Sequence, residues 1–239
     1  MLKMIGFDRY IELKWLNNIA AMRSLTYDHD SIHKHMHEIL INNYPKYEAR
    51  RKTITVLTKI WVRIPNKLEK LQQQALLLFN EVKPSEFIWI QWGMVLVTYP
   101  FFRDIVSTIG RLLLLQTEIT SNEIHLRMEK KWGKRTTLIR AINRVLQSMY
   151  EWNIICQGKD GNILIPPKKI TNNKKLQLWL IEAFLRSESV DSLYLPQIFN
   201  SSTLFPFSIT ISRLDLQKST IFEYSRYNLN NETIIIKSY

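Results

Sequence analysis

The stretch covering residues 120–165 constrains the fold of this chain more than any other part of the sequence. Thr120 and Glu123 have the spacing of a helix capping box, in which the Thr hydroxyl accepts from the amide three residues on and the carboxylate accepts from the first amide. Apolar residues then recur at helical spacing, at Ile124, Met128 and Trp132. Gly133 follows, as a residue just past a helix C-terminus often does, so the pattern predicts a helix and a tight turn.

A second predicted helix follows the turn, and its start is basic. It opens with Lys134, Arg135, Thr136 and Thr137. Its expected buried face is apolar and consists of Leu138, Ile139, Ile142, Val145, Leu146 and Met149. Arg140 and Arg144 lie one turn apart on another face, beside Asn143 and Gln147. Helical spacing therefore separates an apolar stripe from a cationic one that also bears amide side chains.

The period of the pattern changes after Trp152. An apolar run at 154–156 precedes the turn Gly158-Lys159-Asp160-Gly161, a second apolar run follows at 163–165, and two prolines then end it. Two short β-rich runs around a Gly/Asp turn predict a hairpin. The order helix, turn, basic helix and hairpin is that of a winged helix-turn-helix, a module that usually binds double-stranded DNA.

In such a module the start of the second helix meets base edges, and the flanking cations meet phosphates. Arg and Gln suit this task because their planar head groups make paired hydrogen bonds, and the helix N-terminus itself favours phosphate. The residues expected to contact DNA are Lys134, Arg135, Thr136, Thr137, Arg140, Arg144 and Lys159. The alternative is that this segment does not bind nucleic acid. Helix-turn-helix folds also occur as units that only pack within a protein, and a run of charged residues is often only a face exposed to water.

The predicted order of helix, turn and basic helix occurs a second time, near the N-terminus. Helical patterns cover residues 10–25, 31–42 and 46–64, a turn signal lies at 42–45, and Pro65 ends the third helix. The opening turns of that third helix carry Arg50, Arg51 and Lys52. We expect these cations to add a second phosphate contact. No hairpin pattern follows them, so this unit is helix-turn-helix-like without a wing.

The rest of the chain is helical up to about residue 186 and then changes character. Helices are expected at 68–81, 87–98, 100–115 and 174–186, the second of them in the centre of the core. Beyond Ser192, apolar residues alternate with polar ones, which predicts strands at 205–211, 221–227 and 233–237.

The predicted fold class is therefore mostly α, with two helix-turn-helix-like units, the second winged, plus a small C-terminal antiparallel β-sheet. Four segments are expected. They are an N-terminal helix-turn-helix-like domain (1–66), a central helical core (67–118), a winged helix-turn-helix (119–170), and a C-terminal helix with the small sheet (171–239).

Composition favours a nucleic-acid partner and a cytoplasmic location. The 239 residues carry a formal net charge of +12, which suggests a polyanionic partner, although an AT-rich genome would also enrich Lys, Asn and Ile. The single cysteine, Cys156, excludes an intrachain disulfide and fits a reducing compartment. The most apolar stretch, residues 87–102, is shorter than the ~20 residues of a membrane-spanning helix, and the first ten residues lack a secretory signal.

The sequence offers little material for catalysis or for a metal site. His29, His33 and His37 lie four residues apart, but no third ligand is evident, so a solvated histidine face is the expected arrangement. Glu-x-Lys fragments at 12–14 and 129–131 fall in predicted helices, whereas metal-dependent nucleases need that fragment on a strand. No glycine-rich phosphate loop is present. We therefore expect no enzyme activity, no metal and no cofactor.

The layout resembles the BrxA family, the small helical protein of BREX phage-defence systems. The resemblance lies in residues 39–65 with their Arg50-Arg51-Lys52 cluster, in the Tyr99–Asp104 segment, in the Gly133–Thr136 turn, and in the end of the following helix at Trp152–Ile155. It covers about residues 10–186. The resemblance implies a non-enzymatic component that binds double-stranded DNA and works beside a methyltransferase, an ATPase and a phosphatase-like protein.

Other functions stay open at this point. The chain would be a protein–protein adaptor if its helices dock partners and its basic face is incidental. It would be a stand-alone winged-helix transcriptional regulator if a dimer prefers one palindromic operator.

Overall fold

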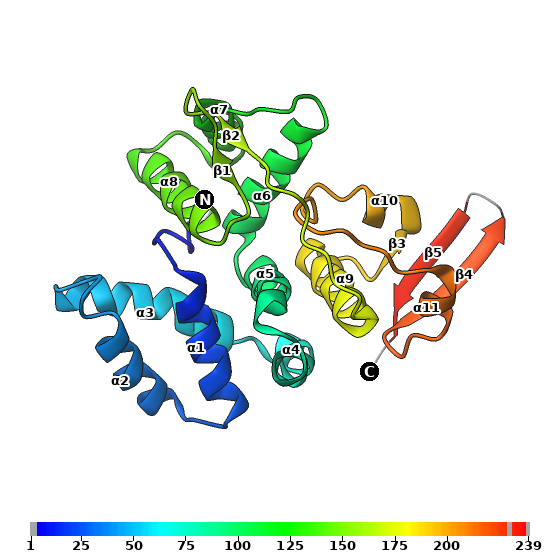
Figure 1. The fold of residues 1–239 in the computed structure, drawn as a ribbon, viewed down its shortest axis with the longest axis horizontal. Helices are drawn as coiled ribbons and strands as arrows, with labels where there is room; N and C mark the ends of the chain where they lie inside the picture. The colour runs from blue at the N-terminus through cyan, green and yellow to red at the C-terminus, as the bar shows by residue number, and fades with distance from the viewer. Residues whose placement is uncertain (1–3, 229–230, 238–239) are drawn as a thin grey trace.

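Helices dominate the fold, and a small sheet lies at its C-terminal end (Figure 1). The computed structural model describes residues 4–228 and 231–237. Its longer helices are α1 (Leu13–Ser24), α2 (His29–Ile39), α3 (Tyr47–Trp61), α4 (Glu69–Glu81), α5 (Phe87–Thr98), α6 (Pro100–Leu113), α7 (Ser121–Trp132), α8 (Thr136–Glu151) and α9 (Lys174–Glu188). The short helices are η1 (Asn66–Leu68), η2 (Pro84–Glu86), α10 (Leu195–Phe199) and α11 (Arg213–Gln217). The prediction of a mostly helical chain with a small C-terminal antiparallel sheet is confirmed.

Helix α5 occupies the centre of the core because its sequence is apolar on every side. Every residue from Ile88 to Leu96 is buried, and α1, α3, α4, α6 and α9 pack around it. The amide of Gln91 is also buried there, where its Oε1 accepts from Trp61 Nε1 at 2.8 Å and its Nε2 donates to Asn17 Oδ1 at 3.0 Å. These bonds satisfy the amide and connect α5 to α3 and α1.

None of the helices in the described ranges combines the length with the apolar character that crossing a bilayer requires. One hydrophobic cluster includes buried residues from each of the four predicted segments. The division into those segments stays a prediction.

The C-terminal sheet has three antiparallel strands in the order β3-β5-β4. Their bounds are β3 (Ser192–Tyr194), β4 (Phe222–Asn228) and β5 (Asn231–Ile236). The outer strands β3 and β4 lie on either side of β5, and Figure 1 shows this sheet at the edge of the molecule, beyond α9. The sequence patterns at 221–227 and 233–237 correspond to β4 and β5, whereas β3 carries no alternation that would have revealed it.

The predicted strand at 205–211 is wrong. Residues 205 and 206 lie in a turn, and the only pairing of the segment within the described chain is an isolated bridge between Phe207 and Lys169. The Phe207 ring instead packs against the rings of Trp89 and Trp92, with centroids 4.5 and 5.7 Å away. The apolar residues of this segment are buried or half-buried, and Phe207 packs on α5 without a neighbouring strand.

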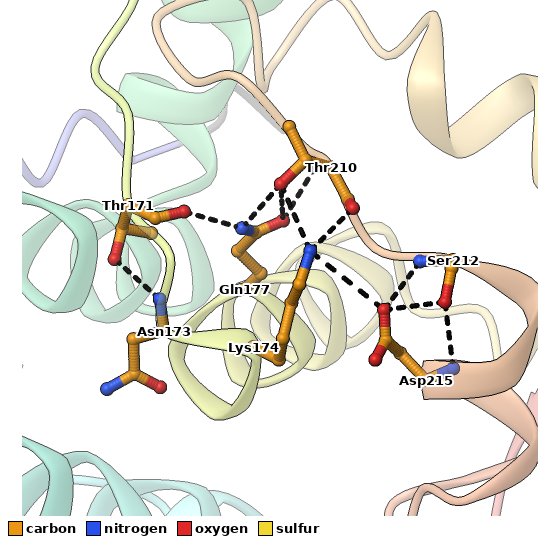
Figure 2. A network of polar contacts seen from close by, with 7 residues as sticks. All are labelled: Thr171, Asn173, Lys174, Gln177, Thr210, Ser212 and Asp215. Atoms are coloured by element: carbon orange, nitrogen blue, oxygen red, sulfur yellow. Dashed lines mark hydrogen bonds and ion pairs between the residues drawn. The ribbon is translucent and has the colours of Figure 1, made fainter.

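A polar network joins the start of α9 to the segment that precedes α11 (Figure 2). The fully buried Gln177 accepts from the Thr210 amide at 2.7 Å and donates to the Thr171 carbonyl at 2.8 Å. Lys174 Nζ donates to the Thr210 carbonyl at 2.7 Å and lies 3.9 Å from Asp215 Oδ2. These bonds hold the C-terminal segment against α9 while they satisfy a buried amide.

Candidate nucleic-acid interface

Helix α7 begins and ends where the sequence pattern places it. Thr120 Oγ1 accepts from the Glu123 amide at 3.2 Å, and Glu123 Oε2 accepts from the Thr120 amide at 2.9 Å, which completes a capping box. Gly133 follows the last turn with a φ of 80°, a conformation that a side chain disfavours. The turn at 133–135 then leads directly into α8.

A buried carboxylate fixes α7 against α6. Asp104, on α6, accepts from Lys131 Nζ at 2.7 Å and from the Trp132 indole at 2.9 Å, both at the end of α7. The Asp104 side chain is buried, and these charge-assisted bonds compensate for its desolvation. Lys131 is therefore held in an intramolecular ion pair and is not among the cations available to a ligand.

Helix α8 has one buried face and one exposed face. The buried residues are Leu138, Ala141, Ile142, Val145, Leu146, Ser148 and Met149. The exposed polar residues are Thr136, Thr137, Arg140, Asn143, Arg144 and Gln147, with Glu151 at the last position. Ile139, which the sequence pattern assigns to the buried face, is 40% exposed because it lies at the border between the two faces.

The predicted cations of this region differ in how they are engaged. Arg140 makes no hydrogen bond or ion pair with any described residue, and Arg144 donates to the neighbouring Gln147 Oε1 at 2.8 Å. Lys134 is exposed in the turn, and Arg135 is half-buried at the N-cap of α8. The guanidinium groups of Arg140 and Arg144 thus face outward.

A two-stranded hairpin follows α8. Its strands, β1 (Cys156–Gln157) and β2 (Ile163–Leu164), are antiparallel, and the exposed Lys159 lies in the turn between them. The backbone of Ile163 also exchanges two hydrogen bonds with Ile119, at 3.1 and 2.7 Å. The hairpin is thereby attached to the residue that precedes the capping box of α7.

The N-terminal segment crosses the end of α8, as the dark blue trace in Figure 1 shows. The Ile11 amide donates to Ser148 Oγ at 2.8 Å, and the Ile11 carbonyl accepts from the Trp152 indole at 2.9 Å. The Leu13 amide donates to Glu151 Oε2 at 2.7 Å. Burial raises the pKa of the Glu151 carboxyl, although its bond to Leu13 acts in the opposite direction.

A groove of about 480 Å³ lies between this segment and α8. Its lining consists of Asp8, Arg9, Thr137, Arg140, Ala141, Asn143, Arg144 and Gln147. Three arginines face a single carboxylate in this lining. No local sequence pattern indicates Arg9 or Asp8, because the contact joins segments whose hydrogen-bonded residues are 137 positions apart.

The other predicted cationic cluster lies at the start of α3. Arg50 is partly engaged, because its Nη1 donates to the carbonyls of Tyr44 at 2.9 Å and Pro45 at 2.7 Å. Arg51 pairs with Glu48 at 2.8 Å. Lys52 is exposed and makes no hydrogen bond or close ion pair with a described residue.

Tyr44 connects the two cationic groups. Its carbonyl accepts from Arg50, and its hydroxyl donates to the Tyr10 carbonyl of the N-terminal segment at 3.1 Å. Burial raises the pKa of the Tyr44 phenol, and the charges of Arg144 and Arg9 act against that rise. The turn between α2 and α3 therefore lies within electrostatic range of the groove beside α8.

Three of the four histidines of α2 form a row of neighbouring rings, the histidine row. The centroids of His29 and His33 are 5.9 Å apart, those of His33 and His37 4.7 Å, and the His37 ring lies 5.0 Å from the Tyr47 ring in a parallel arrangement. In the part of the chain that the structure describes, no three histidine, cysteine or acidic side chains are grouped to hold a metal ion.

Comparison with known proteins finds no family model, no curated protein and no solved structure that matches this chain. The resemblance to the BrxA family stays a prediction.

Proposed function

We propose that this protein binds double-stranded DNA, and that α7, α8 and the hairpin act together as a winged helix-turn-helix. In this proposal the exposed face of α8 enters a groove of the duplex, which it contacts through Arg135, Thr136, Thr137, Arg140 and Arg144. Lys134 and Lys159 contact the phosphate backbone. The order of the elements and the attachment of the hairpin to Ile119, just before the capping box of α7, support this proposal.

The observation that carries the proposal is the chemistry of the exposed α8 face. Arg140 and Arg144 face outward beside Asn143 and Gln147, side chains whose head groups make paired hydrogen bonds with base edges. The only acidic residue of α8 is Glu151, at its last position, where it accepts from Leu13. A duplex approaching the first three turns of α8 therefore meets no carboxylate from this helix.

The start of α8 also suits a phosphate. Its N-cap residue, Arg135, makes no side-chain capping bond, and the first turn carries no acidic residue. The amides of the first turn are therefore not used by a side-chain cap, and the helix dipole favours an anion at this end.

Single arginine replacements test this assignment. Arg140→Gln and Arg144→Gln should each weaken binding to a duplex, and each should lower the slope of log affinity against log salt by about one. Fluorescence anisotropy on a labelled random-sequence duplex at several salt concentrations measures both quantities. Arg111→Gln, an exposed arginine on α6, is the matched control and should leave the slope unchanged. Unaltered binding by both α8 variants would refute the assignment of α8 to the interface.

We further propose that this binding serves a phage-defence system of the BREX type, as the resemblance to BrxA implies. The chain would contribute DNA binding, and its partners, a methyltransferase, an ATPase and a phosphatase-like protein, would carry the enzymatic steps. Deleting its gene from a host that resists phage should restore plaque formation, and the double variant R140Q/R144Q should fail to complement the deletion. Full resistance without the gene would contradict this role.

A protein–protein adaptor is the second candidate function, and one surface favours it. A groove of about 480 Å³ between α4 and α9 is lined in part by Leu77, Leu178 and Ile221, and Leu77 is 65% exposed. An adaptor with an incidental basic face should not shift a random duplex at low micromolar protein concentration. Salt-titrated gel shifts therefore separate the two functions.

A further inference from the structure

We propose that Arg9, Arg140 and Arg144 form one composite phosphate site, which holds a backbone phosphate of the bound duplex at the edge of α8. This inference rests on the proposed DNA binding and adds to it a specific residue from the N-terminal segment. The ligand class is a phosphodiester, and the site is built from two parts of the chain that only the fold brings together.

The geometry of the groove supports a site that exists before the ligand arrives. The N-terminal segment is held on α8 by the bonds of Ile11 to Ser148 and Trp152, and by the bond of Leu13 to Glu151. The Ser148 side chain is fully buried and also donates to the Arg144 carbonyl at 2.9 Å. The backbone that carries Arg9 is therefore anchored two residues away from the arginine itself.

The arginines of the groove are poorly compensated by the protein. Arg140 has no polar partner among the described residues, and Arg144 donates only to the neutral Gln147. Arg9 Nε is buried without a hydrogen bond, and the nearest carboxylate oxygen, Asp8 Oδ1, is 3.8 Å away. Three guanidinium groups thus share one loosely placed carboxylate, and the lining keeps two net positive charges.

A phosphate group matches this lining better than a carboxylate does. Guanidinium groups bind phosphate oxygens through paired N–H donors, and several of them can share one tetrahedral anion. Thr137, Asn143 and Gln147 add neutral polar groups around the same space. Apolar side chains are nearly absent from the lining, where Ala141 is the one such residue, so an apolar ligand would gain little there.

Two variants of the N-terminal segment test the site, and they should change DNA affinity in opposite directions. Arg9→Gln removes one cation, so we expect binding to a random duplex to weaken at least about threefold and the salt slope to fall by about one. Asp8→Asn removes the competing carboxylate, so binding should tighten about twofold or more. A merely structural role for this segment would make both variants weaker.

The same titrations separate this inference from the proposed function. If Arg9→Gln and Asp8→Asn bind like the wild type while Arg140→Gln and Arg144→Gln bind weakly, the composite site is wrong and DNA binding by α8 stands. If all four variants bind like the wild type, the proposed function fails as well. Circular dichroism of each variant excludes loss of folding as the cause of a change.

Inorganic pyrophosphate distinguishes a backbone phosphate from a free one. We expect millimolar pyrophosphate to stabilise the wild-type protein only weakly in thermal unfolding, because a single small anion reaches the groove without the other contacts of a duplex. Stabilisation by pyrophosphate equal to that by duplex DNA, and lost in Arg9→Gln, would overturn the duplex assignment in favour of a free-phosphate site.

Discussion

At the scale of single residues, the histidine row of α2 gives the stability of the fold a dependence on pH. Burial lowers the pKa of His33, the charges of His29 and Arg63 lower it further, and Asp30 opposes them. Burial also lowers the pKa of His37, together with the charges of His33 and Arg50. Arg50 Nε donates to His37 Nδ1 at 3.4 Å, a contact that requires this ring nitrogen to be unprotonated.

We therefore expect stability to decrease as the pH falls through the ordinary histidine pKa of about 6.5. The unfolded chain binds protons at His33 and His37 more readily than the folded chain does, so acid favours unfolding. Urea unfolding at about pH 7.5 and about pH 5.5 measures the difference. The double variant H33Q/H37Q should lose less stability over this range than the wild type, whereas His35→Gln, an exposed histidine on the same helix, serves as the control. If the wild type, H33Q/H37Q and His35→Gln lose the same free energy of unfolding between the two pH values, the histidine row does not contribute to the pH dependence of stability.

At the scale of elements, close packing of α6 against the segment after α10 depends on a glycine. A Cβ added to Gly110 would lie 1.9 Å from the Ser202 carbonyl oxygen, so the two backbones approach to a distance that no side chain allows. Ser107 Oγ and Ser202 Oγ are 3.1 Å apart at the same contact. The contact places the C-terminal segment directly on the helix that supports α7.

Replacement of Gly110 by alanine should therefore destabilise the protein. Within a helix, a change from glycine to alanine normally stabilises the protein by roughly 0.5–1 kcal/mol, whereas overpacking costs about 1–3 kcal/mol. A decrease in the free energy of unfolding would therefore indicate overpacking at this contact. The free energy of unfolding in urea measures it. A more stable Gly110→Ala protein would mean that α6 and the segment after α10 can move apart without loss of stability.

At the scale of the whole molecule, two cationic groups lie around the turn between α2 and α3. One group is the groove of Arg9, Arg140 and Arg144, and the other is the start of α3 with Lys52. Tyr44 contacts both regions, through its bonds to Arg50 and to the N-terminal segment. A duplex bound along α8 would then extend toward α3, and both groups would contribute to the salt dependence of binding.

The two exposed cations in the first turns of α3, Arg51 and Lys52, should differ in their effect on DNA binding. Lys52→Gln should lower the salt slope by about one, because this lysine makes no hydrogen bond or close ion pair with a described residue. Arg51→Gln should change it less, because Glu48 already pairs with this arginine at 2.8 Å. The anisotropy titrations used for α8 measure both slopes. If both variants keep the wild-type slope of log affinity against log salt, α3 does not take part in DNA binding.

The sequence alone determined those features that depend on neighbours within about four residues. The capping box of Thr120 and Glu123, the turn at Gly133 and the division of α8 into apolar and cationic faces all follow from helical spacing, which is a local property. The hydrophobic character of residues 87–98 likewise identified the central helix α5. The outward position of Arg140 and Arg144 could therefore be predicted.

The tertiary structure alone decided which distant segments meet. It placed Arg9 beside α8, added β3 to the sheet, and buried the alternating segment around Phe207 against α5 instead of pairing it. It also paired Lys131 with Asp104, so that a cation that looks free in the sequence is held at the surface by a buried carboxylate. Such contacts depend on how distant segments pack around one hydrophobic core, and the spacing of residues close together in the sequence carries no information about that packing.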